Sequence, residues 1–196
     1  MSAAPLELPP EWPTSLLTAE EYLQLGETEL RTELVEGVVT IAVRPAPKHM
    51  IASFQLTSAI ARVLPPEYQV VQEVDLDLQL VPSGSPGFVR APDLAVIRTG
   101  ALRRVHEPGG VLCASDVVLV VEIVSPGSVR NDRVTKRAEY ADAGIPYYWI
   151  VDIEQPVSLL AHHLAGELGY ADDGEITGTF RTDQPFGFEL ELSRLL

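Results

Sequence analysis

The sequence predicts an α/β fold of the α+β kind, in which a mixed β-sheet is flanked by helices and preceded by an added N-terminal hairpin. Two apolar runs, residues 88–98 and 116–124, are typical of strands that are covered on both faces. Two other segments, residues 49–64 and 128–144, have helical character. The resulting order of helix, hairpin, helix, strands, helix and strands fits a mixed sheet in a single domain.

Local signals place the individual elements. Thr18 with Glu21 three residues later forms a capping box, and Gly144 followed by Pro146 is typical of a helix end. Strict alternation of apolar and acidic or polar residues up to Leu80 indicates a half-buried strand. The expected elements are a helix over 17–25, two strands over 32–43 around a Glu36-Gly37 turn, a helix over 49–64, one strand over 68–80, strands over 88–98 and 116–124, a helix over 128–144, a strand over 147–153, and β-structure with turns to the end.

The length and composition indicate an ordinary globular chain. Residues 1–15 contain four prolines and are expected to form an extended lead-in, which leaves residues 16–196 as a single domain. No segment approaches the ~18 uninterrupted apolar residues of a membrane span, and the N-terminus lacks the basic and apolar regions of a secretory signal. We therefore expect a cytoplasmic protein without a membrane partner. The single cysteine, Cys113, excludes an intrachain disulfide.

The formal charge of -14 argues against a tight, non-specific nucleic-acid binder, because neutralising phosphates requires a basic face. The distribution of charge weakens that objection. Eight of the 14 basic residues lie between positions 90 and 137, so a local basic patch on an acidic body stays open.

Glu122 lies within the apolar run over 116–124 and is the first candidate for a functional residue. Side chains alternate along a strand, so Glu122 shares a face with valines and points into the protein. A buried carboxylate needs a partner, a metal or a proton, although an internal salt bridge or a strand end at solvent would also explain it. Asp93, which starts the other apolar strand, could point to the same spot, and two converging carboxylates suit a hard divalent ion.

Lys136 is the third candidate. Asp132, Lys136 and Tyr140 follow one another at intervals of four and therefore share one face of the expected helix. A solvated helix face would explain this spacing. The helix nevertheless follows the Glu122 strand after a short turn and can lean over that strand's C-terminal end, where ligand sites of open sheets gather.

Taken together, these residues resemble a known superfamily. The "PD" of residues 92–93, the "EIV" beginning at Glu122, and the later pattern "SPGS…D…K…Y…AGIPYYWIVD" are similar to the PD-(D/E)xK restriction-endonuclease-like superfamily. More narrowly, they resemble a large bacterial branch described as endonucleases and largely of unknown function. The resemblance includes "TELVEGVV" followed by "KHM" and extends over most of the chain. It implies a restriction-endonuclease-like core and a metal-dependent phosphodiesterase site.

The resemblance assigns roles to four residues. Asp93 and Glu122 match the acidic Mg²⁺ ligands, and Glu33 matches an additional acid near the N-terminus. The superfamily lysine is expected two residues after Glu122, where this chain has Val124, so Lys136 is the candidate replacement. His49 is a candidate for steadying a water or contacting phosphate. An exposed strand residue at Glu33 and a surface histidine at His49 are the competing interpretations.

The leading hypothesis is a Mg²⁺-dependent endonuclease acting on nucleic acid, with DNA as the expected substrate and Mn²⁺ as a possible substitute for Mg²⁺. Because duplex cleavage by a chain with one site usually requires two copies, we expect a homodimer. The alternative is a non-catalytic module of the same fold that binds nucleic acid or a protein partner. A hydrolase that uses a carboxylate pair on another substrate is a third possibility.

Overall fold

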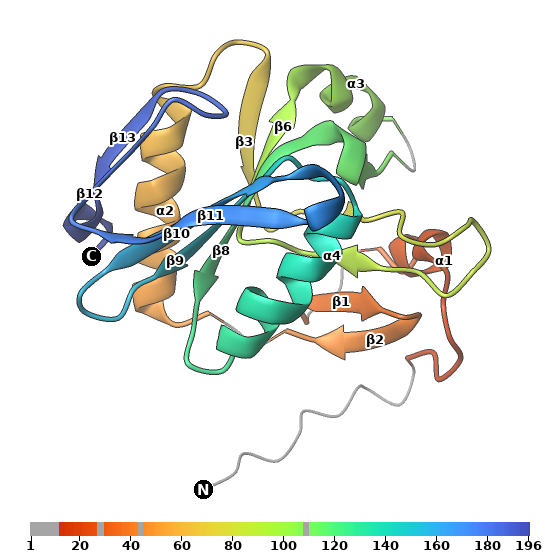
Figure 1. Ribbon diagram of the computed structural model, residues 1–196. Helices are drawn as coiled ribbons and strands as arrows, with labels where there is room; N and C mark the ends of the chain where they lie inside the picture. Colours follow the sequence, from red (N-terminus) through yellow and green to blue (C-terminus); the bar gives the residue numbers. More distant parts are fainter. Residues whose placement is uncertain (1–11, 27–29, 43–44, 108–109) are drawn as a thin grey trace, which may run out of the picture.

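The computed structural model describes residues 12–26, 30–42, 45–107 and 110–196 (Figure 1). Most of the expected lead-in over 1–15 lies outside the described residues. The structure is a mixed α/β arrangement of sheets flanked by helices, which confirms the predicted fold class. In these ranges, we find no helix with the length and apolar character needed to cross a membrane.

The larger sheet has six strands in the order β11-β10-β9-β8-β6-β3. Only the β8–β9 pair is parallel, and the other neighbours are antiparallel. Every residue of β8 is buried, as the apolar run predicted. The strands are β3 (Tyr68–Gln72), β6 (Leu94–Arg98), β8 (Val117–Val124), β9 (Tyr147–Asp152), β10 (Ser158–Leu164) and β11 (Tyr170–Thr177).

A second sheet contains the predicted hairpin. Its strand order is β2-β1-β5-β4-β7. The hairpin turns at Glu36 and Gly37, whose φ angles of 51° and 77° are the positive values that a tight two-residue turn requires. The strands are β1 (Thr32–Val35), β2 (Val38–Ile41), β4 (Leu76–Asp77), β5 (Val89–Arg90) and β7 (Leu112–Cys113), and a separate pair consists of β12 (Thr179–Thr182) and β13 (Phe188–Glu191).

Two segments expected to be single strands are divided between these sheets. The segment 68–80 leaves the larger sheet after β3, turns at Glu73 with a φ of 50°, and enters the smaller sheet as β4. The segment 88–98 is likewise divided into β5 and β6. The prediction of one strand in each case was wrong, because neither the alternation over 68–80 nor the apolar run over 88–98 reveals a change of sheet. Asp93 therefore lies between the two sheets.

Helices cover both faces of the larger sheet (Figure 1). The helix α2 (Pro47–Ala61) packs Ala52, Leu56 and Ile60 against one face. The opposite face packs against Tyr140 of α4 (Arg137–Asp142), which continues a π-helical turn, η3 (Asn131–Lys136). The remaining helical elements are α1 (Ala19–Leu23), α3 (Leu102–Val105), η1 (Thr99–Ala101), η2 (Ala114–Asp116), η4 (Gly166–Leu168) and η5 (Leu192–Leu195).

His162 is an unusually placed histidine on β10. It is buried, whereas its neighbour His163 is exposed, as expected for adjacent strand residues. The ring stacks on Tyr148 and Tyr170, with centroid separations of 5.8 Å to each. Nδ1 lies 3.2 Å from Asp172 Oδ2, without hydrogen-bond geometry. Burial lowers the pKa of His162 to about 4, so the ring is neutral in the folded protein at pH 7.

From the lowered pKa of His162 we predict that the folded protein loses stability in acid. Between pH 6.5 and about 4 the unfolded chain binds a proton at His162 that the folded chain rejects, so stability falls as the pH falls. We expect His162→Phe to lose less stability than the wild type between pH 7 and pH 4.5, by about 2 kcal/mol. Urea unfolding at both pH values measures the difference, with His163→Gln as the control. Equal pH dependence of wild type and His162→Phe would contradict the prediction.

Candidate active site

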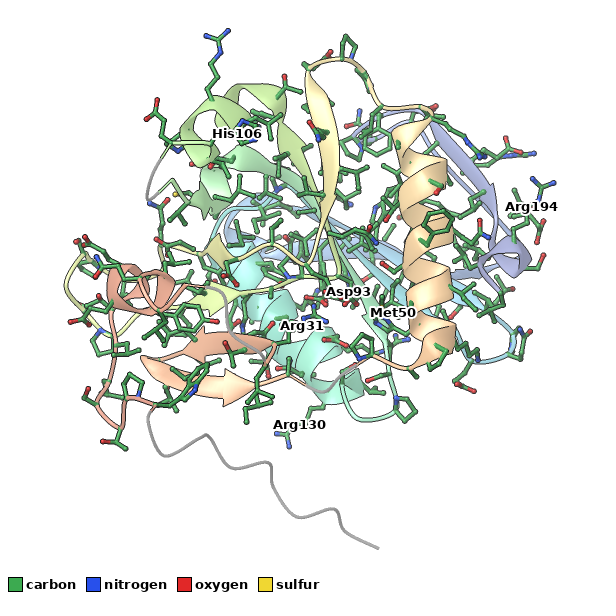
Figure 2. All side chains as sticks on the ribbon, turned by 180° about the vertical axis from the view of Figure 1, so that it is seen from behind. Arg31, Met50, Asp93, His106, Arg130 and Arg194 are labelled. Carbon is green, nitrogen blue, oxygen red and sulfur yellow. The ribbon has the colours of Figure 1, made fainter. Side chains whose placement is uncertain are left out.

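A cavity of about 610 Å³ lies between the β1–β2 hairpin, the start of α2, the end of β8 and the turn η3. It is lined by all five residues singled out in the sequence, namely Glu33, His49, Asp93, Glu122 and Lys136. In Figure 2, Asp93 and Arg31 lie side by side in the interior of the molecule. The structure therefore brings together residues that are spread over 104 positions, from 33 to 136.

The Lys136 ammonium is the centre of a buried ion-pair cluster. Nζ lies 2.8 Å from Glu122 Oε1 and 3.0 Å from Glu33 Oε1, and 4.0 Å from Asp132 Oδ1. Lys136 is 5% exposed, so a solvated helix face is the wrong interpretation. Tyr140 also donates to Glu122 Oε1, at 2.8 Å, from one turn further along the helix. The helical lysine thus reaches the strand carboxylate that the sequence predicted it to approach.

Glu33 is fully engaged in this cluster. Its Oε1 accepts from the backbone N–H of Ala91 at 3.2 Å in addition to its ion pair with Lys136. Its Oε2 accepts from Arg90 at 2.8 Å, and the same guanidinium forms two bonds of 2.6 Å with Glu139. The interpretation of Glu33 as an exposed strand residue is therefore wrong. The contacts make it a group that positions Lys136 and Arg90.

Asp93 is held by the strand that carries Glu122. Its Oδ2 accepts the backbone N–H of Ile123 at 2.8 Å and contacts His49 Nε2 at 3.0 Å. Its Oδ1 accepts from Arg31 at 3.3 Å. His49 is 8% exposed, which excludes the surface-histidine interpretation. Asp93 is thus bonded to Ile123, the residue next to Glu122 on β8, and both carboxylates border the same cavity.

The charged groups shift one another's pKa values. Burial alone would lower the pKa of Lys136, but the carboxylates of Glu122 and Glu33 outweigh burial and raise it. Burial opposes ionisation of Asp93, but the hydrogen bond and charge of His49 outweigh it, and the pKa of Asp93 is lowered. For Glu122, burial dominates over the attraction of Lys136 and raises the pKa to about 7, with Asp93 adding to the effect. Of the two carboxylates, Glu122 is thus the one whose ionised form is stabilised less by its surroundings.

The cluster carries more negative than positive charge. Five carboxylates belong to it (Glu33, Asp93, Glu122, Asp132 and Glu139), against three cations (Arg31, Arg90 and Lys136). With all of these ionised, and before His49 is counted, the excess is two negative charges. Burial is the main cause that raises the pKa of Asp132, and the charges of Asp93 and Glu33 add to it. A divalent cation would neutralise the excess charge.

The donor set suits such a cation. Among the described residues, no group of three or more His, Cys, Asp and Glu side chains is assembled as a metal site. Asp93 and Glu122 nevertheless offer carboxylate oxygens to one cavity, and oxygen is the preferred ligand of Mg²⁺ and Mn²⁺. The hydrogen bonds that Glu122 accepts from Lys136 and Tyr140 both use Oε1, which leaves Oε2 as its oxygen for a cation. These residues therefore fit a divalent metal ion.

The basic residues between 90 and 137 do not gather into one patch. Arg90 and Lys136 are buried, and Arg104 and Arg133 pair with Asp116 and Glu175. Figure 2 places His106, next to the α3 arginines, and Arg130 far apart on the molecule. Half of the eight cations, these four, thus pair with carboxylates of the chain itself.

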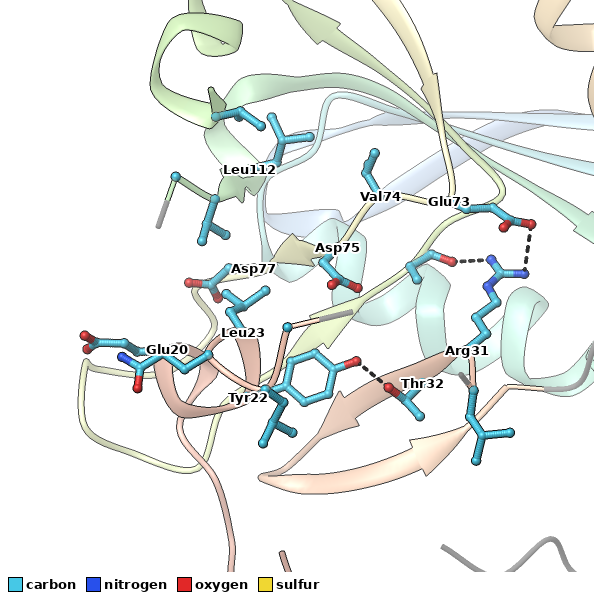
Figure 3. A pocket seen from close by; sticks show the side chains of 18 residues that line it. Glu20, Tyr22, Leu23, Arg31, Thr32, Glu73, Val74, Asp75, Asp77 and Leu112 are labelled. Atoms are coloured by element: carbon cyan, nitrogen blue, oxygen red, sulfur yellow. Dashed lines mark hydrogen bonds and ion pairs between the residues drawn. The ribbon is translucent and has the colours of Figure 1, made fainter. Parts of the chain in front are cut away.

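A second cavity, of about 1150 Å³, adjoins the first through Arg31, which lines both (Figure 3). Arg31 donates to the carbonyl of Ala91 at 2.5 Å and lies 3.8 Å from Glu73. Asp75 and Asp77 add further acidic side chains to the lining. Arg31 therefore links Asp93 to an acidic, open hollow.

Five residues of the cluster were missed or underrated by sequence reasoning: Arg31, Arg90, Asp132, Glu139 and Tyr140. Arginines within apolar strand segments are a usable signal, since a buried guanidinium requires carboxylate partners. Asp132 and Tyr140 share the helix face of Lys136, so their spacing had pointed to the site. Tyr140 is both buried and a donor to Glu122.

Known proteins resemble this chain in sequence and in fold. The model of the Uma2 family, described as "Putative restriction endonuclease", matches residues 19–177. A crystal structure described as a "putative nuclease" from Anabaena variabilis matches with a TM-score of 0.67 and 19% identity, covering 91% of this chain and 97% of that chain. No curated protein matches. These findings confirm the resemblance inferred from the sequence motifs and support a nuclease-like function.

From the ion pairs of Lys136 we predict that a second substitution, at Glu122, recovers part of the stability that the loss of the lysine costs. Lys136→Met leaves Glu122 and Glu33 without their shared cation and is expected to cost about 3–5 kcal/mol of unfolding free energy. Adding Glu122→Gln removes the uncompensated charge and should recover at least about 1 kcal/mol. Urea unfolding of the single and double variants tests this. Lys48→Met, which removes the other lysine and an exposed 3.4 Å pair with Glu154, is the control and should change stability by less than about 1 kcal/mol.

Proposed function

Because this chain belongs to the Uma2 family, whose description is "Putative restriction endonuclease", we propose that it is a metal-dependent endonuclease that hydrolyses phosphodiester bonds of DNA. The nuclease-like function follows from the family. The metal dependence and the DNA substrate are our proposals and are supported by the cavity and its charges.

One observation carries the proposal. Lys136 Nζ lies 2.8 Å from Glu122 Oε1 in a cavity that Asp93 also lines, although the lysine belongs to a helix and Val124 occupies the strand position. The chain thus has two carboxylates and one amine around a single space, and metal-dependent phosphodiester hydrolysis can use such a set.

We assign Asp93 and Glu122 as ligands of Mg²⁺, for which Mn²⁺ is a substitute. When bound, the ion supplies Lewis-acid polarisation of a phosphate oxygen and lowers the pKa of water. Lys136 contributes a mobile point charge that orients a water or stabilises charge developing on the phosphate. Glu33, with Arg90, keeps Lys136 in reach. His49 contacts Asp93 and belongs to the same site.

A second candidate function is binding without cleavage. It is favoured by the charge of -14 and by the close pairing of Lys136 with both Glu122 and Glu33, which engages the amine in the cluster. Such a module would bind nucleic acid or a protein partner. The experiment on nicking below separates the two functions.

We also propose that residues 16–196 act as one domain in the cytoplasm. Support for one domain comes from the C-terminal segment, because Phe180, Phe188 and Leu192 share a hydrophobic core with Leu56 of α2. The segment after residue 177 is thus packed on the part that matches the family.

Activity should depend on the carboxylates and the lysine in different ways. Asp93→Asn should abolish both Mg²⁺ binding and nicking of supercoiled plasmid, because it removes a ligand charge. Lys136→Met should retain metal binding but nick about 10²–10³-fold more slowly, since the amine acts on the transition state. Calorimetry with Mg²⁺ and a plasmid assay on the same samples measure both, after circular dichroism has verified folding.

Arg103→Met serves as the control, because it removes one exposed positive charge outside the cavity and should nick like the wild type. Wild-type protein that binds Mg²⁺ and DNA but never nicks would establish the non-catalytic module. Nicking that survives in Asp93→Asn would contradict the assigned site.

Duplex cleavage predicts a two-fold dimer, since one site cuts one strand. In light scattering after gel filtration, the mass should be twice that of the 21.4 kDa chain. A mass that stays at one chain over a wide concentration range, with or without duplex DNA, would contradict the dimer and point to single-strand nicking.

A further inference from the structure

The first turns of α2 are apolar on the side that faces solvent as well as on the side that packs against the larger sheet. On the outer side, Met50, Ile51 and Phe54 are 50%, 52% and 65% exposed. Among the described helices and strands, no other exposes three large apolar side chains. A surface helix normally confines its apolar residues to the packed side, so this outer stripe is a surface that a partner would cover.

The outer stripe has the composition of a protein interface. Residues 50, 51 and 54 are three or four positions apart along the helix, so their side chains form one continuous patch. Interfaces between proteins combine an apolar centre, in which aromatic residues and methionine are common, with a polar rim. Exposed or half-exposed polar side chains of the same helix and its C-cap supply such a rim, namely Lys48, Gln55 and Arg62.

The charge around the outer stripe favours a second copy of this chain as the partner. Two copies that each carry a charge of -14 repel one another wherever their carboxylates meet. Residues 37–66, which include the whole of α2, contain no Asp or Glu and are the longest stretch of the chain without one. The apolar side chains of the stripe also offer no hydrogen-bond donor to a phosphate. Repulsion between copies is therefore weakest here, and DNA finds few contacts.

We propose that the outer stripe is the contact between two copies of this chain, in which the two α2 helices cross on a two-fold axis and Phe54 of each copy packs on the stripe of the other. A two-fold contact uses the same patch on both copies, so a self-complementary apolar stripe needs no other partner. This inference rests on the dimer of the proposed function and adds the surface that forms it.

The position of the stripe relates the contact to the candidate active site. His49, which lines the cavity and contacts Asp93, directly precedes the stripe on the same helix. Figure 2 shows Met50 at the end of α2 that lies nearer to Asp93. Phe54 is five residues beyond His49, which is about 7.5 Å along the helix axis. Two cavities would thus lie close to one two-fold axis, an arrangement suited to the two strands of one duplex.

Sedimentation of Phe54→Asp over a range of concentrations tests the contact. The substitution places two carboxylates in the apolar centre of the interface, so the dissociation constant of the dimer should rise at least about 100-fold. Phe54 belongs to none of the core clusters, and circular dichroism verifies that the variant folds. Leu168→Asp is the control, because it adds the same charge at a leucine that is 90% exposed on η4, and it should dimerise like the wild type.

Cross-linking provides a second readout that keeps the outer stripe intact. Gln55→Cys, made together with Cys113→Ser so that position 55 carries the only thiol, should give a covalent dimer with a short bis-maleimide. Gln55 is exposed beside Phe54, and the two-fold axis brings it close to its own copy. Leu168→Cys in the same background should stay a single chain.

The outcomes separate this inference from the proposed function. A wild-type dimer whose dissociation constant is unchanged in Phe54→Asp would overturn the stripe as the contact but leave the proposed dimer. A wild-type dimer without a cross-link at position 55 would do the same, and it decides the question if Phe54→Asp fails to fold. Wild-type protein that stays a single chain with and without duplex DNA would overturn the inference and the proposed dimer together, whereas nicking is measured independently.

Discussion

The buried ion pairs of Lys136 are the interaction on which the arrangement of the site depends. Glu33 belongs to the smaller sheet, Glu122 to the larger sheet, and Lys136 to the helical segment between β8 and β9. One ammonium therefore joins two sheets and a helix. A charge buried in this way is tolerated only while its partners are present, so the three elements are held to one geometry.

The same cluster leaves its carboxylates incompletely neutralised. Arg90 divides its guanidinium between Glu33 and Glu139, and Arg31 divides its own between Asp93 and Glu73. Burial then raises the pKa of Glu122, which has lost water without gaining a full counter-charge. A fold selected for stability alone would avoid this cost. Retaining it is characteristic of sites that take up a cation or a proton during function.

From the sequence, the residues of the site could be predicted better than the arrangement of the strands in the sheets. Glu122 could be found because a carboxylate in an all-apolar strand contradicts its surroundings, and Lys136 because its spacing from Asp132 and Tyr140 defines one helix face. The division of 68–80 between two sheets could not be found, because β3 and β4 are both extended and differ only in their distant partners. The strand β11 was not identified individually, since most of its residues are exposed and polar and leave little alternation to detect. Burial of His49 also depends on tertiary contacts, which its position at the start of a helix does not encode.

The amine of this site lies on a helix, whereas Val124 occupies the strand position where a lysine was expected. This difference changes the kind of motion that the site permits. A residue on β8 is held by hydrogen bonds to strands on both sides, whereas Lys136 is the last residue of η3, a widely wound turn that continues into the regular helix α4. Rewinding that turn to the α form would displace one residue and rotate the lysine by about 100° around the helix axis. Such a rotation would take the positive charge away from Glu122 and Glu33 and leave both carboxylates buried without it, which is costly. A lysine on the strand would offer no such adjustment.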